Sequence, residues 1–299
     1  MSASAAVASG TGTAAGRRRP AVRPGRLAGR AGFFILLAIF VIASLFPFYW
    51  IVITSLKTTA EYNQGTTSLL PPSHITFSNY IDDFTQQDFI RPLLNSVGVS
   101  LVTTLLTVVI AALAGYALSR TSIRGKTGIL GFILLAAFFP ALAIVGPMFI
   151  AYKHLGLLNT LPGLVICYLI LTLPLATWLL TNYFSQIPKE LEEAAIVDGT
   201  SRVQALRKVI VPVAMPAMFT VAILSFILAW NDFTFAVSFI STSNNYTAPL
   251  AIYNLGQSQF QVFYGLIDAA VVIISLPIAL LVIFAQKRII SGLTAGSFR

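Results

Sequence analysis

The stretch FFILLAIFVIASLFPFYWIVIT occupies residues 33–54 and contains no Asp, Glu, Lys, Arg or His. A helix rises about 1.5 Å per residue, so a stretch of this length covers the roughly 30 Å of hydrocarbon in a bilayer. Five further apolar stretches lie at residues 93–118, 128–151, 161–183, 211–235 and 266–286. Of the 299 residues, 57% are hydrophobic and 10% are charged, which is too apolar for an ordinary soluble domain. The sequence therefore predicts an all-α integral membrane protein with six transmembrane helices, rather than a soluble domain with very hydrophobic core helices.

The residues before the first apolar stretch, 1–32, are rich in Ala, Gly and Ser and carry six arginines. A cleavable signal peptide is the competing interpretation. The apolar stretch is about twice the length of a usual signal core, and no small-residue cleavage site closes it. We therefore expect a disordered basic tail at residues 1–32, a six-helix transmembrane domain at 33–290 and a short tail at 291–299.

The 19 Lys and Arg residues are unequally divided between the two sides of the membrane. With six spans, the side that holds both termini receives 16 of them and the opposite side receives three. Cytoplasmic segments of membrane proteins are enriched in Lys and Arg, so both termini are predicted to be cytoplasmic. The same rule explains the net charge of +9 without a nucleic-acid partner. We expect a multi-pass protein of a bacterial cell membrane.

Prolines interrupt most of the predicted spans, and such breaks are tolerated in membrane helices because neighbouring groups satisfy the freed backbone. These prolines are Pro47, Pro140, Pro147, Pro174 and Pro277. They suggest kinked helices around a pathway.

The longest internal cytoplasmic connection, residues 184–210, predicts two short helices joined by a sharp turn. Pro188 suits the first position of a helix, and the acidic residues that follow complement its dipole. Gly199 can adopt the left-handed conformation that ends a helix, and Thr200 or Ser201 can cap the next one. Leu191, Ala194 and Ala195 are spaced to gather on one side. Composition alone leaves two alternatives open: docking on a soluble partner, or an amphipathic surface helix.

A motif in this connection carries a specific resemblance. Glu193-Ala194-Ala195 is followed after three residues by Gly199, and after nine more by Val209-Ile210-Val211-Pro212. This pattern resembles the EAA loop, EAA-x3-G-x9-I-x-L-P, of the permease subunits of binding-protein-dependent ABC importers. The resemblance implies the type I permease fold and assigns ATPase docking to Glu190, Leu191, Glu193, Ala194, Ala195, Asp198, Gly199 and Pro212.

Other segments narrow the resemblance to carbohydrate permeases of the maltose type. They are Ala114–Arg120, Pro174–Leu180, Ile187–Glu193 and Ala229–Asp232. The C-terminal Gly292–Gly296 is similar to the end of the smaller maltose-type permease subunit, which reaches between the ATPases. The resemblance implies a C-terminal ATPase contact by Gly292, Leu293, Thr294 and Gly296. It also implies as partners a homologous second permease subunit, two cytoplasmic ATPase subunits and an extracytoplasmic sugar-binding protein.

No catalytic or metal-binding motif is found in the sequence. Gly125-Lys126-Thr127 matches only the end of a phosphate-binding loop, because Arg120 stands where the first glycine is required. We therefore expect no enzymatic activity in this chain, with ATP and Mg used by the partner subunits. His74 and His154 lack metal-ligand spacing, and the single cysteine, Cys167, is expected to be a packing residue.

The acids Asp232 and Asp268 lie in or beside the last two spans and fall near the outer interface. Two roles remain possible for these acids. They can cap a helix end or snorkel to the interface, or they can line the outer mouth of the pathway. Packing and gate-lining are both open for Trp230 and Asn231. An ion-coupled secondary transporter is the rival class, but no ionisable residue lies in the middle of a span. A permease for another small polar solute also remains open.

The predicted extracytoplasmic loop at residues 241–263 has no charged residue. Its amides and hydroxyls can exchange hydrogen bonds with a sugar, and its aromatic rings can pack in a protein cleft. In the maltose-type family the corresponding loop enters the open binding protein, which implies a binding-protein contact here. The alternative is a loop that packs on the outer helix ends. The candidates are Asn244, Asn245, Tyr246, Tyr253, Asn254, Gln257 and Gln259.

Overall fold

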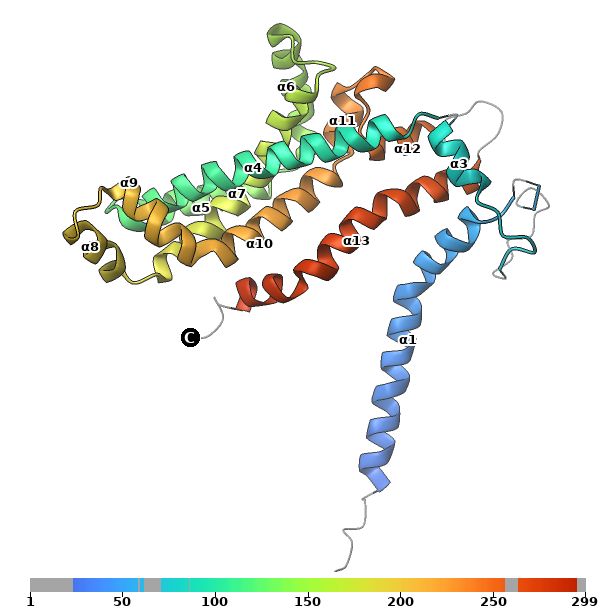
Figure 1. Ribbon diagram of the computed structural model, residues 1–299, viewed down its shortest axis with the longest axis horizontal. Coiled ribbons are helices and arrows are strands. Elements are labelled where there is room, and N and C mark those ends of the chain that lie inside the picture. The colour runs from blue at the N-terminus through green and yellow to red at the C-terminus, as the bar shows by residue number, and fades with distance from the viewer. Residues whose placement is uncertain (1–23, 59, 62–70, 86, 256–262, 295–299) are drawn as a thin grey trace, which may run out of the picture. The chain divides into compact units, whose positions relative to one another are not determined.

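The computed structural model describes residues 24–58, 60–61, 71–85, 87–255 and 263–294. Every regular element in these ranges is helical (Figure 1). In chain order they are α1 (Pro24–Ser55), α3 (Ser78–Thr85), α4 (Ile90–Arg120), α5 (Lys126–Ala137), α6 (Ala141–Leu155), α7 (Leu161–Gln186), α8 (Lys189–Val197), α9 (Arg202–Ala205), the π-helix η1 (Leu206–Ile210), α10 (Val211–Trp230), α11 (Thr234–Phe239), the 3-10 helix η2 (Ser243–Asn245), α12 (Ala248–Leu255) and α13 (Tyr264–Thr294). The predicted fold class is confirmed.

The chain divides into two compact units, residues 1–49 and residues 50–299. In the first unit, α1 begins at Pro24, inside the segment 1–32 that the sequence analysis assigns to a disordered tail. Proline is favoured in the first turn of a helix, and Leu, Ala and Arg propagate it well. The part of the predicted tail at residues 1–23 lies outside the described residues. The side chains of residues 32–49 are exposed, so this apolar helix requires lipid or another protein around it.

Five helical stretches are long and apolar enough to cross a membrane, and they match five of the predicted spans. They are Gly32–Ser55, Ile90–Arg120, Leu161–Gln186, Arg202–Trp230 and Tyr264–Gln286. The helices α5 and α6 form a sixth span if they are counted together, but they meet at an angle of 90°. The predicted span over residues 128–151 is therefore a bent pair of helices, in agreement with the kink that its prolines suggest. The break falls at Pro140, which has an extended backbone, lacks an N–H donor and disfavours the helical conformation of the residue before it.

The predicted fifth span, 211–235, also ends earlier than expected. Helix α10 stops at Trp230, and the separate short helix α11 starts at Thr234. The carboxylate of Asp232 accepts hydrogen bonds from the backbone N–H groups of Phe235 (3.1 Å) and Ala236 (3.2 Å). An acid that satisfies the first N–H groups of a new helix favours a start at this point over the continuation of α10.

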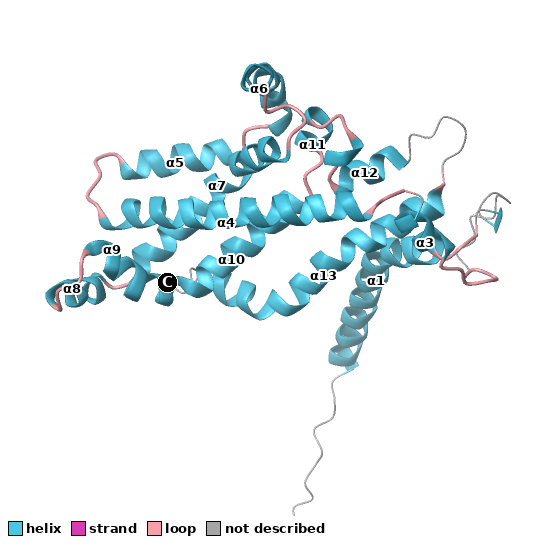
Figure 2. Cartoon of the chain, turned by 45° about the horizontal axis from the view of Figure 1, so that its top comes forward, coloured by secondary structure: helices cyan, strands magenta, loops and turns pink. Residues whose placement is uncertain are grey.

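In the second unit, α4 packs along α7, and α10 packs against both of them (Figure 2). Small and aliphatic residues line part of the interface among these three helices and let the helices approach closely. Close packing is needed because lipid gives no hydrophobic driving force for helix association. The lining residues include Ala111, Ala112, Ala176, Leu180 and Ala214. A hydrogen bond of 2.6 Å between the buried hydroxyls of Thr107 and Thr172 joins α4 to α7. A second cluster gathers α6, α7 and α11 around the buried Cys167 and the aromatic rings of Tyr152, Phe235 and Phe239.

Gly115 lies where α4 and α7 approach each other closely. A Cβ atom at this position would lie 3.0 Å from the backbone nitrogen of Thr181 and 3.2 Å from Cβ of Leu180. At Gly98 on the same helix, an added Cβ meets no described atom within 4 Å. The two glycines therefore provide a matched pair.

We expect Gly115→Leu to destabilise the protein by about 1–3 kcal/mol, because the side chain must push the α7 backbone away. The measurement is the thermal unfolding of the purified protein in detergent. Gly98→Leu is the control, and this variant should lose much less stability. Equal losses in the two variants would contradict the close packing at Gly115.

Candidate functional site

The predicted cytoplasmic connection forms a helical knob, which we define as residues 188–205. Pro188 is extended and precedes α8, so it is the N-cap residue and not the first helical residue that the sequence analysis expects. The difference arises because ψ of 136° at Pro188 is incompatible with a helical position. Glu190 and Glu192 then occupy the first turn of α8, where they complement the positive end of its dipole.

The turn after α8 is confirmed as a left-handed helix end at Gly199, whose φ is +88°. The N–H of Gly199 donates to the carbonyl of Ile196 (3.0 Å), and the N–H of Thr200 donates to the carbonyl of Ala195 (3.1 Å). These two bonds form a Schellman motif, which satisfies carbonyls that the helix end leaves free. The turn is therefore fixed by backbone bonding, and its direction depends on a residue that tolerates positive φ.

The second helix of the knob starts with a capping box. The hydroxyl of Ser201 accepts from the backbone N–H of Gln204, and the side chain of Gln204 accepts from the N–H of Ser201. Of the two predicted caps, Ser201 rather than Thr200 fills the position. From Arg202 the chain runs through α9 and η1 into α10 without a break. Pro212 lies exposed in the first turn of α10.

The exposed side of the knob differs from the prediction at Ala195. Leu191, Glu193 and Ala194 are exposed, but Ala195 is buried together with Glu192. The helical period places residues three apart on the same face, and this face of α8 turns toward the transmembrane helices. The remaining predicted docking residues, Glu190, Asp198 and Gly199, are also exposed.

Three exposed apolar residues of the knob were not among the predicted docking residues. Val197 is 86% exposed and Val203 is 75% exposed, and they lie on either side of the Gly199 turn, while Ile196 is 41% exposed. Large exposed apolar side chains indicate contact with another protein. No signal in the sequence separates them from the buried apolar residues of the same connection, such as Ile187.

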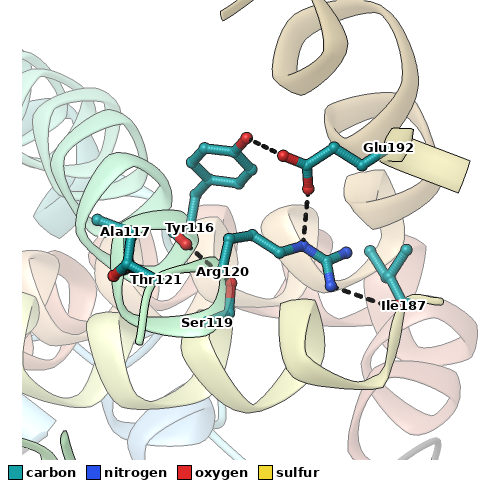
Figure 3. Close-up of polar contacts among 7 residues, drawn as sticks. All are labelled: Tyr116, Ala117, Ser119, Arg120, Thr121, Ile187 and Glu192. Atoms are coloured by element: carbon teal, nitrogen blue, oxygen red, sulfur yellow. Dashed lines mark hydrogen bonds and ion pairs between the residues drawn. The ribbon is translucent and has the colours of Figure 1, made fainter. Parts of the chain in front are cut away.

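The buried face of α8 carries a polar network that the sequence analysis did not identify (Figure 3). The Oε2 atom of Glu192 lies 3.0 Å from Nε of Arg120, the last residue of α4. Its Oε1 atom accepts a hydrogen bond of 2.5 Å from the hydroxyl of Tyr116. The Nη1 atom of Arg120 donates to the carbonyl of Ile187, the residue that ends α7 (3.0 Å). Arg120, at the end of α4, thus contacts both α8 and the end of α7.

The predicted pathway residues lie at or near the outer ends of α10 and α13. The indole nitrogen of Trp230 donates to the carbonyl of Ile274 in α13 (3.3 Å), and the ring is buried. Asn231 is exposed, and its amide donates to the carbonyl of Ile227. Asp232 caps α11, and Asp268 is half-buried near the start of α13. Trp230 thus has the contacts of a packing residue and Asp232 those of a cap, while gate roles for the four residues stay predictions.

The outer segment, which we define as residues 241–255 of the predicted extracytoplasmic loop, contains the two short helices η2 and α12. Asn95 of α4 holds it by donating to the carbonyls of Asn244 and Tyr246, each at 2.9 Å. The amide of Asn245 donates to the carbonyl of Asn159 (2.7 Å). Satisfied backbone groups and the apolar face of α12 explain why this segment folds on the outer ends of the helices.

Other candidates of the outer segment remain exposed. Tyr253 is 46% exposed, with its ring centroid 5.2 Å from that of Phe233, and Asn254 is also exposed. A pocket of about 530 Å³ lies beside them, and its polar lining residues are Gln87, Asp88, Arg91, Ser243, Asn244 and Asn254. Gln257 and Gln259 lie outside the described residues.

The predicted C-terminal contact residues Gly292, Leu293 and Thr294 continue helix α13, and Gly296 lies outside the described residues. The histidines His74 and His154 are exposed and lie in different connections. Neither belongs to a cluster of potential metal ligands among the described residues.

Comparison with known proteins agrees with the resemblance seen in the sequence. Over 274 residues the chain is 42% identical to the trehalose transport system permease protein SugB of Mycobacterium tuberculosis, covering 91% of this chain and 99% of that protein. It is 39% identical to the sulfoquinovosyl glycerol transport system permease protein SmoH of Agrobacterium fabrum, covering 89% and 93%. A crystal structure of a bacterial ABC transporter involved in the import of the acidic polysaccharide alginate contains a chain with a TM-score of 0.77 and 26% identity, covering 90% and 99%.

A family profile gives the same assignment. Residues 107–294 match the family described as the binding-protein-dependent transport system inner membrane component. This range begins in α4 and includes α7, the helical knob, α10 and α13. The chain is therefore a multi-pass membrane protein that belongs to the family of binding-protein-dependent transport system inner membrane components.

Proposed function

We propose that this chain forms half of a translocation pathway for a sugar, which an extracytoplasmic binding protein delivers and separate ATPase subunits drive. The observation that carries the proposal is the helical knob. Its EAA register is built on a rigid Schellman turn and projects Leu191, Glu193 and Ala194 away from the bundle. A homologous second permease subunit would complete the pathway, and ATP and Mg would be used only by the ATPases.

The mechanism follows from the position of the knob at the inner ends of the helices. Closure of the ATPases on ATP displaces α8, and the bundle rocks so that the pathway opens to the outside. A ligand or partner can shift such an equilibrium only by binding one state more tightly than the other. Through their contacts with the knob, the ATPases bind one state of the bundle more tightly than the other. A saccharide substrate is supported by two relatives that are named for the transport of trehalose and of sulfoquinovosyl glycerol.

The Gly199→Val variant tests ATPase docking. A β-branched residue cannot readily adopt the φ of +88°, so α9 should leave α8 in a different direction. We expect sugar uptake in proteoliposomes to fall on the order of tenfold or more, because a strain of about 1–3 kcal/mol disfavours the docking geometry. The measurement is uptake of radiolabelled trehalose and related disaccharides, with co-purification of the ATPase.

Gly199→Asn is the matched control. Asparagine enters the left-handed region more readily than other residues that carry a side chain, and an added Cβ at this position meets no described atom within 4 Å. This variant should retain most uptake. Wild-type uptake and ATPase co-purification in Gly199→Val would contradict docking through the turn, and a complex that hydrolyses ATP but carries no saccharide would favour another small polar solute.

The outer segment supports a contact with the binding protein. Tyr253→Ala combined with Asn254→Ala removes two exposed side chains from α12. We expect half-maximal uptake to require on the order of tenfold more binding protein, since exposed aromatic residues carry much of the energy of protein interfaces. His154→Ala, which is exposed in a different outward connection, is the control. Unchanged uptake by the double variant at limiting binding protein would contradict the proposed contact with the binding protein.

The proposed orientation places both termini in the cytoplasm. Single cysteines in a Cys167→Ala background report it through an impermeant maleimide applied to intact cells. We expect Ser243→Cys to be labelled and Arg124→Cys to be protected until the membrane is opened, because Lys and Arg are retained on the cytoplasmic side. Both positions are exposed, so accessibility does not limit the reaction. The reverse labelling pattern would overturn the orientation.

A further inference from the structure

The polar network beneath α8 involves residues for which the proposed function has no role. The side chains of Arg120 and Glu192 are only 7% and 11% exposed. Two opposite charges are therefore withdrawn from water at the point where the helical knob meets the transmembrane helices. Removing one partner of such a pair is strongly destabilising because it leaves a buried charge uncompensated. Here Nη1 of Arg120 has a second partner, while Nη2 has none among the described residues.

The geometry uses both oxygens of the carboxylate. Oε2 of Glu192 pairs with Arg120, and Oε1 accepts from Tyr116. Tyr116 and Arg120 are four residues apart, so they project from one face of α4. A single acid on α8 is held by two side chains of α4, which restrains its position more closely than one bond would.

The same network reaches α7. Arg120 donates to the carbonyl of Ile187, which no longer belongs to the α-helical ladder at the end of α7. Because α4 and α7 pack along each other and are joined by the Thr107–Thr172 hydrogen bond, they behave as one packed pair. The α8 helix is therefore held against the α4–α7 pair by side-chain contacts.

The chain itself also joins α8 to the bundle, on both sides. Ile187 and Pro188 connect it directly to α7, and the other connection runs through α9 and η1 into α10. This second connection passes through a helix of four residues and a π-helix of five residues. A π-helix has a less regular hydrogen-bond pattern than an α-helix and often marks a functional position. A displacement of α8 can thus reach α7 and α10 through the backbone, but it reaches α4 through side chains.

We propose that Glu192, Arg120 and Tyr116 are positioning residues that transmit the displacement of α8 to the α4–α7 pair. This inference rests on the proposed function, because it assumes that an ATPase moves α8. The network makes α8, α4 and α7 move together. Without it, α8 stays connected to α7 and α10 through the chain, but ATPase closure moves the knob while α4 lags behind. The signature of its loss is uncoupling: ATP is hydrolysed but less sugar is carried for each ATP.

The test uses the complete complex reconstituted in proteoliposomes with its binding protein. We expect Glu192→Gln to lower the number of sugar molecules carried per ATP hydrolysed on the order of fivefold, while binding-protein-stimulated hydrolysis continues. Tyr116→Phe keeps the ion pair and removes one hydrogen bond, so its ratio should fall less. The exchanged pair Arg120→Glu with Glu192→Arg should recover part of the ratio lost by either single exchange. Arg124→Gln, an exposed charge just beyond the end of α4, is the control and should keep the wild-type ratio.

The outcomes separate this inference from the function on which it rests. If the wild-type complex carries no sugar, the proposed function is wrong, and the inference is wrong with it because no sugar is carried per ATP hydrolysed. If the wild type couples transport to hydrolysis and Glu192→Gln has the same ratio, the inference alone is overturned. It is also overturned if uptake and hydrolysis fall in equal proportion to the amount of assembled complex, since that is the result of a purely structural role. If Glu192→Gln does not assemble, Tyr116→Phe decides in its place.

Discussion

The low polarity of the bilayer core is the constraint on which the rest of this structure depends. A backbone N–H or C=O group in hydrocarbon has no water to bond, so each spanning segment must satisfy these groups internally as a helix. Ionisable side chains are excluded from the same region for the same reason. The charged residues of this chain therefore gather at helix ends, and the helix ends become the places where partners and regulation can act.

The inner end of α4 illustrates this consequence. Arg120 is the last residue of α4, and Glu192 approaches it from the helical knob. Both side chains are largely withdrawn from water, at 7% and 11% exposure. Such an ion pair is stronger than one on an open surface because the surroundings screen it less. The junction between the helical knob and the transmembrane helices therefore combines an ion pair with directional hydrogen bonds.

Inside the membrane the helices are held by a different means. Small residues such as Ala111, Ala176 and Gly115 bring α4 and α7 close together, and the threonine hydroxyls form a hydrogen bond where the helices meet. Lipid offers as apolar an environment as the helix interface, so close packing and interhelical bonds replace the hydrophobic effect. At the other end, α12 forms and Asp232 caps the backbone N–H groups of Phe235 and Ala236, so the chain turns back with these two donors paired. The two ends of the bundle are thus shaped by caps and the middle by packing.

The amino-acid sequence by itself determined the spans, the helical class, the family and the turn of the helical knob. These features follow from local properties: the length of an apolar run, the EAA register and the positive φ that Gly199 supplies. Only the tertiary structure decided the 90° break at Pro140, the fold of the outer segment on α4, the burial of Ala195 and the network of Arg120, Tyr116 and Glu192. Tyr116 and Glu192 lie far apart in the chain, and periodicity cannot reveal that their helix ends meet. The partner of a side chain is set by how whole helices pack, which no local pattern encodes.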